Sequence, residues 1–548
     1  MEDCKENVLK RNEIICAVCF VILSAVMIAT LSFTRNYFNY GTETDFLGGF
    51  VSEAERVLNG DPLHLDFHPP LYPVLLACVK TLFSDWFLTG LTISFFCSLV
   101  VLAVSFLFFH KLYGGYAAWG SLLALMTSTV FVSYSAQATS DLFFVALFYI
   151  AFFVGYLAME GGGWKMWLVT GLVVGCALLT RSNSLTLLSL SALPFMQKTS
   201  WNQKIRSMCF ILVGLMFPIL LWVGAAKVTG SPLMPSGNHV NLALTYFSPS
   251  ADRISGDARR HVETKFESVV DVISYDPKHL IITYVKDLYD NLKRIFNQNS
   301  FIPFPFNLFA LPGVLILCLS TRRSWHFIFI VSVLLQIALV NFKAFEARYY
   351  MFIIPFLGAG VGMLIHYLIE LSRSTKFNIA LSFCMLLLFF VAEKNVINDS
   401  YVILHSSDDE LNEVLPAAQI ELNQHVNSDV IARKPHLGYY LPYKTCFLFP
   451  QVETMNDLGK ALESMWHGGT LNLFYGSAEL RNRPGLSELR FGKKTPGWLQ
   501  VVAKSKNPGS WVLYRYLPES SAGKGLEIGR MSISKGAEKI DHAARRND

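Results

Sequence analysis

The stretch FLTGLTISFFCSLVVLAVSFLFF at residues 87–109 decides the fold class. These 23 residues carry no charge. As an α-helix they rise roughly 35 Å, enough to cross the ~30 Å hydrocarbon core of a bilayer. The whole chain shares this bias, since 52% of its 548 residues are hydrophobic, 16% are charged and the mean hydropathy is +0.38. Soluble domains are nearer a quarter charged, so the sequence predicts a membrane protein.

Apolar runs of similar length lie on both sides of this stretch. We expect the first of them to be a retained helix, because it lacks a small-residue cleavage site and further runs follow. The short run at residues 71–83 is expected to dip into the membrane or to share a crossing with the next run. The sequence predicts a mainly α bundle of about eleven transmembrane helices. The other runs lie at residues 14–31, 116–134, 142–159, 164–179, 184–196, 208–228, 303–319, 325–342, 349–371 and 377–391.

Clusters of Lys and Arg predict the orientation, because basic residues in short loops stay on the cytoplasmic side. Four clusters can be cytoplasmic together: Lys10 with Arg11, residues 198–206, Arg322 with Arg323, and Arg373 with Lys376. The net charge of +5 is small, and the Lys and Arg residues lie in short clusters between apolar runs. Nucleic acid is therefore not an expected partner, because a protein that binds it concentrates these residues on one face. If these clusters are cytoplasmic, each crossing of the membrane alternates the side on which the next loop lies. Counting the crossings in this way places five segments outside: residues 34–70, the Asp141 turn, Arg181, residues 230–302 and residues 343–348.

The composition becomes polar after Ala392, which divides the chain into domains. We expect a polytopic transmembrane domain at residues 1–398, a small extracytoplasmic α/β domain at 399–517 and a disordered tail at 518–548. In the α/β domain the patterns predict a helix at 408–426, strands at 430–432 and 445–449, and a hairpin of residues 499–504 with 511–516.

The first outer loop is the first candidate site. Glu43 and Asp45 lie at its start, an amphipathic helix is expected at residues 50–58, and Asp66 and His68 precede a pair of prolines. A carboxylate that is partly desolvated at a membrane surface suits a general base, and a histidine can help to hold a phosphate. The alternative is a solvated loop in which Asp45 caps a helix.

Two more candidate sites lie on the predicted outer side. Asp141 opens an apolar run, where it is either functional or the N-cap of a helix. Lys343 and Arg348, together with Arg181, can form an anion site for a lipid phosphate. The alternative is that these cations snorkel to lipid head groups. Residues 431–440 combine basic and aromatic side chains that can recognise an acceptor, or they form a buried strand followed by a helix.

Metal binding is a further possibility in the first outer loop. Glu43, Asp45, Asp66 and His68 offer oxygen ligands with one imidazole, a set that suits Mg, Mn or Zn. No motif with metal-ligand spacing supports such a site.

Five segments in this order resemble the polytopic C-type (GT-C) glycosyltransferases. The resemblance is to the branch of the protein O-mannosyltransferases and the bacterial aminoarabinose transferase, and it covers roughly the first 400 residues. Each motif is weak alone, and the ordered set is more specific. The segments are Thr44-Asp45, His68-Pro69-Pro70-Leu71-Tyr72-Pro73, Ser140-Asp141-Leu142-Phe143, GCALLTR at 175–181 and Ala347-Arg348-Tyr349-Tyr350.

The resemblance implies roles for these residues. Asp45 corresponds to the proposed catalytic base, Asp141 to a second acidic residue, and Arg348 to an arginine before an aromatic pair. His68 stands where the family often has a lysine that contacts the lipid phosphate. Phosphate contacts are expected from His68, Arg181, Lys343 and Arg348, and substrate or metal contacts from Glu43, Asp66, Tyr72, Glu346 and Tyr349.

The implied activity is inverting transfer of a sugar from a polyprenyl-phosphate donor to a hydroxyl of an extracytoplasmic glycan, lipid or protein. The implied location is the cell envelope, in the inner membrane of a bacterium. A transporter is the rival from another class, but its charges usually lie at mid-membrane and its helices often repeat. A lipid-linked glycan ligase or polymerase is the third reading, distinguished by a diphosphate donor.

Overall fold

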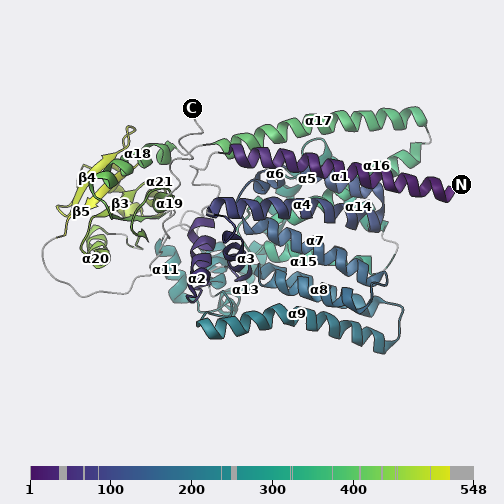
Figure 1. Ribbon diagram of the computed structural model, residues 1–548, viewed down its shortest axis with the longest axis horizontal. Coiled ribbons are helices and arrows are strands. Elements are labelled where there is room, and N and C mark those ends of the chain that lie inside the picture. The colour runs from purple at the N-terminus through teal and green to yellow at the C-terminus, as the bar shows by residue number, and fades with distance from the viewer. Residues whose placement is uncertain are drawn as a thin grey trace.

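The computed structural model describes residues 2–35, 46–65, 68–83, 85–235, 237–248, 256–320, 323, 325–372, 374–406, 409–433, 436–450, 452, 454–493 and 495–518. Long helices lie side by side in a bundle, and a small sheet domain sits beyond one end of it (Figure 1). The bundle comprises α1 (Glu2–Thr34), α4 (Trp86–Tyr113), α5 (Gly115–Met126), α6 (Thr129–Ser135), α7 (Ser140–Met159), α8 (Gly163–Leu178), η2 (Ser182–Met196), α9 (Trp201–Thr229), α14 (Phe306–Leu319), α15 (His326–Val340), η3 (Ala347–Ile353), α16 (Ile354–Ser372) and α17 (Thr375–His405).

Within the described ranges, six helices are long and apolar enough to cross a membrane, or seven if the bent pair α5 and α6 forms one span. Four shorter apolar helices, α8, α14, α15 and α3 (Leu71–Lys80), accompany them. The predicted count of about eleven crossings is roughly consistent with this set. At ten residues, α3 is only about 15 Å long and is too short to cross alone.

Small residues allow close helix packing in the bundle. A Cβ added to Gly171 of α8 would lie 2.0 Å from the Ile211 carbonyl oxygen of α9, and one on Gly214 would lie 2.1 Å from the Leu168 carbonyl oxygen. The backbones of α8 and α9 therefore touch at these two glycines, as is common between membrane helices.

Two of the predicted apolar runs do not form a straight α-helix. Residues 116–134 do not form one straight helix, because the chain bends by 65° between α5 and α6, where Ser128 caps the new helix. Residues 184–196 belong to η2, a 3₁₀ helix that contains Pro194. Its serine hydroxyls donate to carbonyls three residues earlier, as in Ser189 to Thr186 at 2.6 Å, and such local bonds favour the tighter helix.

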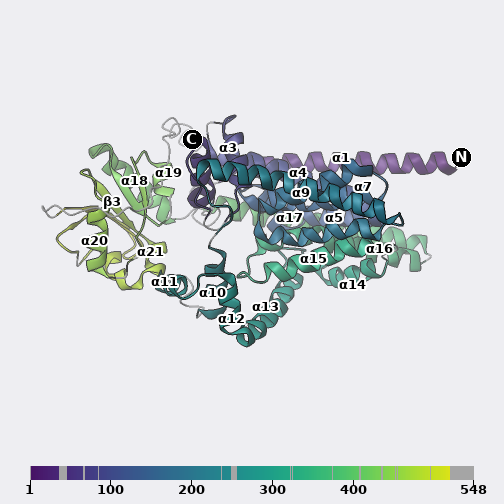
Figure 2. The same cartoon turned by 90° about the horizontal axis from the view of Figure 1, so that it is seen from below.

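The end of the bundle that faces the sheet domain carries the elements predicted to lie outside. A short π-helical turn, η1 (Phe46–Val51), leads into α2 (Ser52–Asn59), which confirms the expected amphipathic helix at 50–58. The second outer loop forms α10 (Asn238–Phe247), α11 (Gly256–Lys265), α12 (Val269–Tyr275) and α13 (Pro277–Asn297), which lie together beside the bundle (Figure 2).

The C-terminal domain is a five-stranded sheet in the order β2-β1-β3-β5-β4 with helices around it. Strands β1, β2 and β3 are parallel, and β5 is antiparallel to β3 and β4. The predicted helix, strands and hairpin are confirmed, but the central strand β3 was not predicted. α17 runs to His405, so the expected boundary at 398 falls inside this helix. The elements are α18 (Asp409–Gln424), β1 (Asp429–Ala432), α19 (His436–Tyr440), β2 (Cys446–Leu448), α20 (Met455–Met465), β3 (Leu471–Tyr475), α21 (Ser477–Asn482), η4 (Pro484–Phe491), β4 (Leu499–Lys504) and β5 (Val512–Tyr516).

Candidate functional site

Asp141 is fixed at the start of α7. The N-cap is Thr139, whose hydroxyl accepts a hydrogen bond from the Asp141 backbone N–H at 3.1 Å and donates one to Asp141 Oδ2 at 2.6 Å. The alternative of Asp141 as the N-cap is therefore wrong, because the cap lies two residues earlier. The Asp141 side chain is only 2% exposed and forms an ion pair with Arg181 through Oδ1.

Arg181 follows the end of α8 in extended backbone and precedes η2. Its side chain is 11% exposed, and its guanidinium faces the ring of Tyr349 at 5.3 Å from the ring centroid. The Leu71 N–H donates to the Leu179 carbonyl oxygen at 2.8 Å. This bond joins the start of α3 to the end of α8, so His68 and its prolines lie beside Arg181.

The loop after α15 is anchored by a buried amide. Asn341 donates to the Tyr284 carbonyl at 3.1 Å and accepts from Asn291 at 2.8 Å, and its own carbonyl accepts from the Tyr246 hydroxyl at 3.1 Å. These bonds tie the loop to α13 and α10, and they fix the residues that follow. Farther along the loop, Arg348 pairs with Glu346 at 2.5 Å.

Three cations surround the Tyr349 ring. The Arg181 and Arg348 guanidinium carbons lie 5.3 and 5.1 Å from the ring centroid, and the Lys343 ammonium lies 5.4 Å from it. Each is within the ~6 Å range of a cation–π contact. Tyr349 is therefore a platform that gathers three positive charges from two separate segments of the chain.

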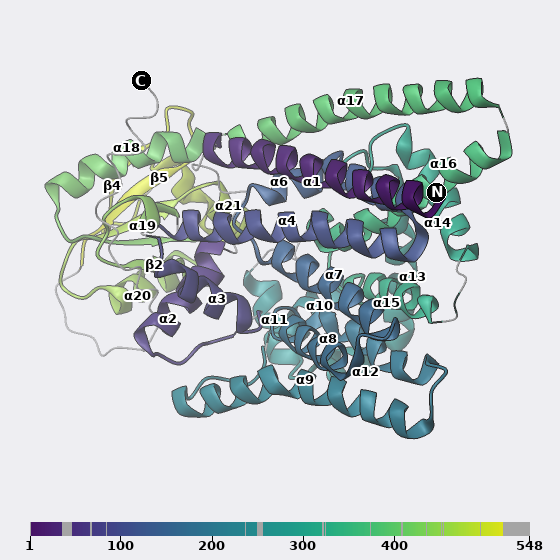
Figure 3. The same cartoon turned by 45° about the vertical axis from the view of Figure 1, so that its right-hand side comes forward.

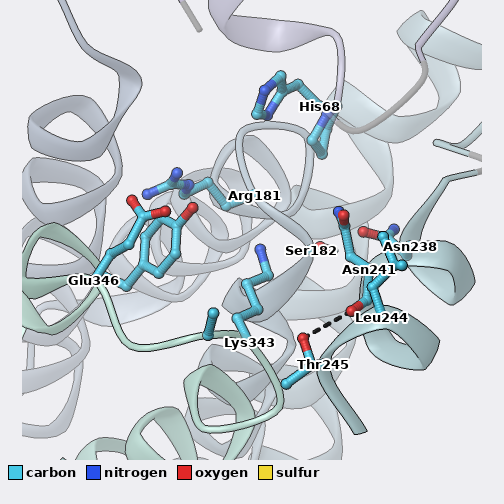
Figure 4. Close-up of a pocket in the computed structure, with 12 residues that line it drawn as sticks. His68, Arg181, Ser182, Asn238, Asn241, Leu244, Thr245, Lys343 and Glu346 are labelled. Carbon is cyan, nitrogen blue, oxygen red and sulfur yellow. Dashed lines mark hydrogen bonds between the residues drawn. The ribbon is translucent and has the colours of Figure 1, made fainter. Parts of the chain in front are cut away.

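A cavity of about 250 Å³ opens beside this platform. Figure 4 shows the Lys343 ammonium pointing into the space between Arg181 and the asparagines of α10. α10 contributes a polar wall with Asn238, Asn241 and Thr245, and the Thr245 hydroxyl donates to the Asn241 carbonyl at 2.8 Å. The remaining lining residues are His68, Pro69, Ser182, Leu244, Ala344, Glu346 and Tyr349.

The charges of the site are unevenly compensated. Arg181 is paired with Asp141 and Arg348 with Glu346, whereas within the described ranges Lys343 has no ion pair. Burial, with the repulsion of Arg181 and Arg348, lowers the pKa of Lys343 to about 8. The arrangement can accept an anion at Lys343, because an anion would relieve this repulsion.

The structure brings together most of the predicted site residues. His68, Arg181, Lys343, Glu346 and Tyr349 line one cavity. Arg348 and Asp141 lie directly behind its wall, paired with Glu346 and Arg181. Tyr72 lies elsewhere, buried among aromatic rings, with Phe50 at 4.8 Å and Phe143 at 6.2 Å between ring centroids. Glu43, Asp45 and Asp66 lie outside the described residues.

Sequence reasoning missed the polar wall of α10. Asn238, Asn241 and Thr245 were seen only as part of the long loop at 230–302. Their one signal is the spacing of three and four residues between polar side chains, which puts them on one helix face.

No cluster of three or more His, Cys, Asp or Glu side chains that could hold a metal ion occurs in the part of the chain that the structure describes. Three of the four predicted ligands, Glu43, Asp45 and Asp66, lie outside that part.

Comparisons with known proteins agree with this architecture. Residues 67–223 match the family described as dolichyl-phosphate-mannose-protein mannosyltransferase. No curated protein matches the chain. The crystal structure of ArnT from Cupriavidus metallidurans bound to undecaprenyl phosphate superposes with a TM-score of 0.57 at 11% identity, covering 92% of this chain and 99% of that chain. The apo structure of the same protein gives a TM-score of 0.54 at 13% identity, covering 91% and 97%.

At this identity the likeness to ArnT shows a shared fold, over 92% of this chain in one structure and 91% in the other. The apolar helices and this fold make the chain a multi-pass membrane protein. The family match covers α3 to α9, the region that supplies His68, Asp141 and Arg181. Residues 67–223 are therefore similar to the O-mannosyltransferase family, and the chain shares the fold of ArnT.

Proposed function

We propose that the protein is an inverting glycosyltransferase that moves a sugar from a polyprenyl-phosphate donor to a hydroxyl of an extracytoplasmic glycan, lipid or protein. The observation that carries this proposal is the cluster of Arg181, Lys343 and Arg348 around Tyr349, beside the cavity. Guanidinium forks and an ammonium group are the side chains that bind phosphate oxygens best.

Lys343 is the cation that the donor phosphate binds first in this proposal. Both arginines already have carboxylate partners, so each gives only part of its charge to a ligand. Lys343 points into the cavity with no ion pair in the described ranges (Figure 4). The family match and the undecaprenyl phosphate bound by ArnT support a lipid-linked donor.

The proposed reaction is a displacement at the anomeric carbon of the sugar. The acceptor oxygen attacks the anomeric carbon from the face opposite the phosphate, and a new C–O bond forms as the bond from that carbon to the phosphate oxygen breaks. Asp45 takes the acceptor proton, and Lys343 with the arginines stabilises the departing phosphate. Attack from the opposite face inverts the anomeric configuration.

The proposed location is the bacterial inner membrane, with the cavity and the sheet domain on the extracytoplasmic side. The basic clusters expected in the cytoplasm support this orientation. We also propose that a divalent cation binds in the first outer loop. Transfer measured with and without a chelator tests this proposal.

The test uses the purified full chain in nanodiscs with a panel of radiolabelled polyprenyl-monophosphate sugars and a cell-envelope extract. We expect the wild type to transfer label, and Lys343→Met to weaken binding of undecaprenyl phosphate about ten-fold. Lys227→Met is the matched control, since it removes an exposed lysine at the end of α9 and should change nothing. A folded Asp45→Asn variant should bind the donor without transferring the sugar.

Three outcomes would count against the proposal. Unchanged phosphate binding by Lys343→Met removes the cation cluster from the donor site. Consumption of diphosphate donors alone favours a ligase or polymerase. No consumption of any donor by a folded wild type favours a transporter.

A further inference from the structure

The sheet domain is bonded to the membrane domain at the start of α4. α19 lies beside this helix end (Figure 3), and the Tyr439 hydroxyl donates to Asp85 Oδ1 at 2.7 Å. The Tyr439 ring meets Phe87 edge-on, with 5.0 Å between ring centroids. The neighbouring Tyr440 ring lies parallel to Phe87 at 6.5 Å. One hydrogen bond and two ring contacts thus join segments about 350 residues apart.

Asp85, which accepts this hydrogen bond, also caps a helix. Asp85 is the N-cap of α4, and its Oδ1 also accepts from the Phe87 backbone N–H at 2.7 Å. Burial and the nearby Asp85 raise the pKa of Tyr439, so the phenol keeps its proton and remains a donor. A bond to a carboxylate is stronger than one between neutral groups. The contact therefore fixes the sheet domain to a rigid helix end.

A chain of rings continues from this contact to the cavity. Phe87 packs on Phe46, the first residue of η1, at 5.7 Å between centroids. Phe50, in the same turn, packs on His68 at 4.3 Å, and His68 lines the cavity. Gly90 of α4 makes room for Phe46, because an added Cβ would lie 2.6 Å from its ring.

We propose that the sheet domain, through Tyr439, holds η1 in place and thereby positions His68 at the cavity, where its imidazole stabilises the charge that develops on the departing phosphate. Tyr439 is a positioning residue here, since it acts through Phe87 and Phe46 and does not line the cavity. The inference rests on the proposed function for its kinetic consequence. The contact itself stands on the geometry above.

The geometry predicts which step the contact affects. The cations proposed to bind phosphate are Arg181, which follows α8 and pairs with Asp141 of α7, and Lys343 and Arg348 in the loop after α15. The contacts of Tyr439 and Tyr440 with Asp85 and Phe87 involve none of these three side chains. Loosening Tyr439 should therefore leave donor binding intact and slow the transfer step. Small displacements of a catalytic group have large kinetic effects.

The test compares Tyr439→Phe with wild type in full-length protein in nanodiscs. We expect kcat to fall about 10-fold, with the KM for donor and the affinity for undecaprenyl phosphate unchanged. Backbone hydrogen exchange of residues 46–51 should become faster. Asp85→Asn keeps a carbonyl acceptor for both bonds and should retain most of the activity.

Tyr443→Phe is the matched control, because it removes a buried hydroxyl from the same domain. A similar fall in kcat for Tyr443→Phe would mean that the sheet domain is merely destabilised, and would overturn the inference. Unchanged exchange at residues 46–51 in Tyr439→Phe would also overturn it. If the wild type transfers no sugar, the proposed function fails, and the exchange measurement still decides this inference.

Discussion

Two halves of the candidate site are built in different ways. The first half is the pair of Asp141 and Arg181, formed where α7 begins and α8 ends, and these side chains are only 2% and 11% exposed. The second half is the loop after α15, where Arg348 is 18% exposed and its partner Glu346 is 47% exposed. Both halves meet at Tyr349.

The difference separates structural from adjustable charge. A carboxylate buried without its cation is costly, so the first half holds the helix ends together as well as shaping the site. An exposed ion pair contributes little to stability, so the second half can change charge at low cost. The site therefore combines a buried, rigid ion pair with a loop whose more exposed ion pair can rearrange when a ligand binds.

The largest expected effect comes from removing one arginine from each half. Arg181→Met should lower the free energy of unfolding by about 3–5 kcal/mol, because it leaves Asp141 buried without its cation. Arg348→Met should lower it by at most about 1 kcal/mol. Thermal unfolding in detergent measures the difference, and binding of undecaprenyl phosphate should weaken in both variants. Equal losses of stability would show that the two halves do not differ in this way.

The second effect concerns Lys343 between the two halves. Its pKa of about 8 lies below the ordinary value of 10.5, so above pH 8 the free protein loses this charge. Affinity for undecaprenyl phosphate should fall about ten-fold between pH 8 and 10. The unfolded chain binds more protons than the folded one over that range, so stability without ligand should rise as affinity falls. In Lys343→Arg the charge persists, so calorimetry should show the same affinity for undecaprenyl phosphate at pH 8 and at pH 10. A fall in affinity like that of the wild type would mean that another group titrates in this range.

A smaller effect is expected from the caps. Thr139 and Thr454 both cap a helix and donate to an aspartate, at 2.6 and 2.8 Å, but Thr139 is buried and Thr454 exposed. Thr139→Ala should lower the free energy of unfolding by about 1 kcal/mol and Thr454→Ala by about 0.5 kcal/mol. Only Thr139→Ala should slow sugar transfer, since it releases Asp141. A reversed order in thermal unfolding would contradict the contrast between buried and exposed charge.

The bundle was predictable because its signal is local. Long uncharged runs identify membrane helices residue by residue, and the basic clusters group Asp141, Arg181 and residues 343–348 at one end. Elements without a local signal were missed. β3 is buried along its whole length, so it lacks the alternating pattern by which half-buried strands are recognised.

The site shows the same limit. The charged residues of the site were predicted because a charge beside an apolar run is unusual in the sequence. The polar residues that α10 contributes are Asn and Thr, and these are common in any outer loop. Tyr349 was expected to touch substrate, but its place among three cations depends on how α8 meets the loop after α15. The bond of Tyr439 to Asp85 joins two domains, and no pattern within either segment predicts it.

The smallest expected effect tests the exposed half alone. Glu346→Gln should change the free energy of unfolding by less than about 1 kcal/mol, because the Glu346 side chain is 47% exposed and water screens its ion pair with Arg348. Arg348 then loses this competing carboxylate, and affinity for undecaprenyl phosphate should rise about two-fold at low ionic strength and less at high salt. Glu267→Gln, an exposed change in the second outer loop, is the control. Weaker binding by Glu346→Gln would contradict this account, because it would mean that the carboxylate contacts the donor and does not compete with its phosphate for Arg348.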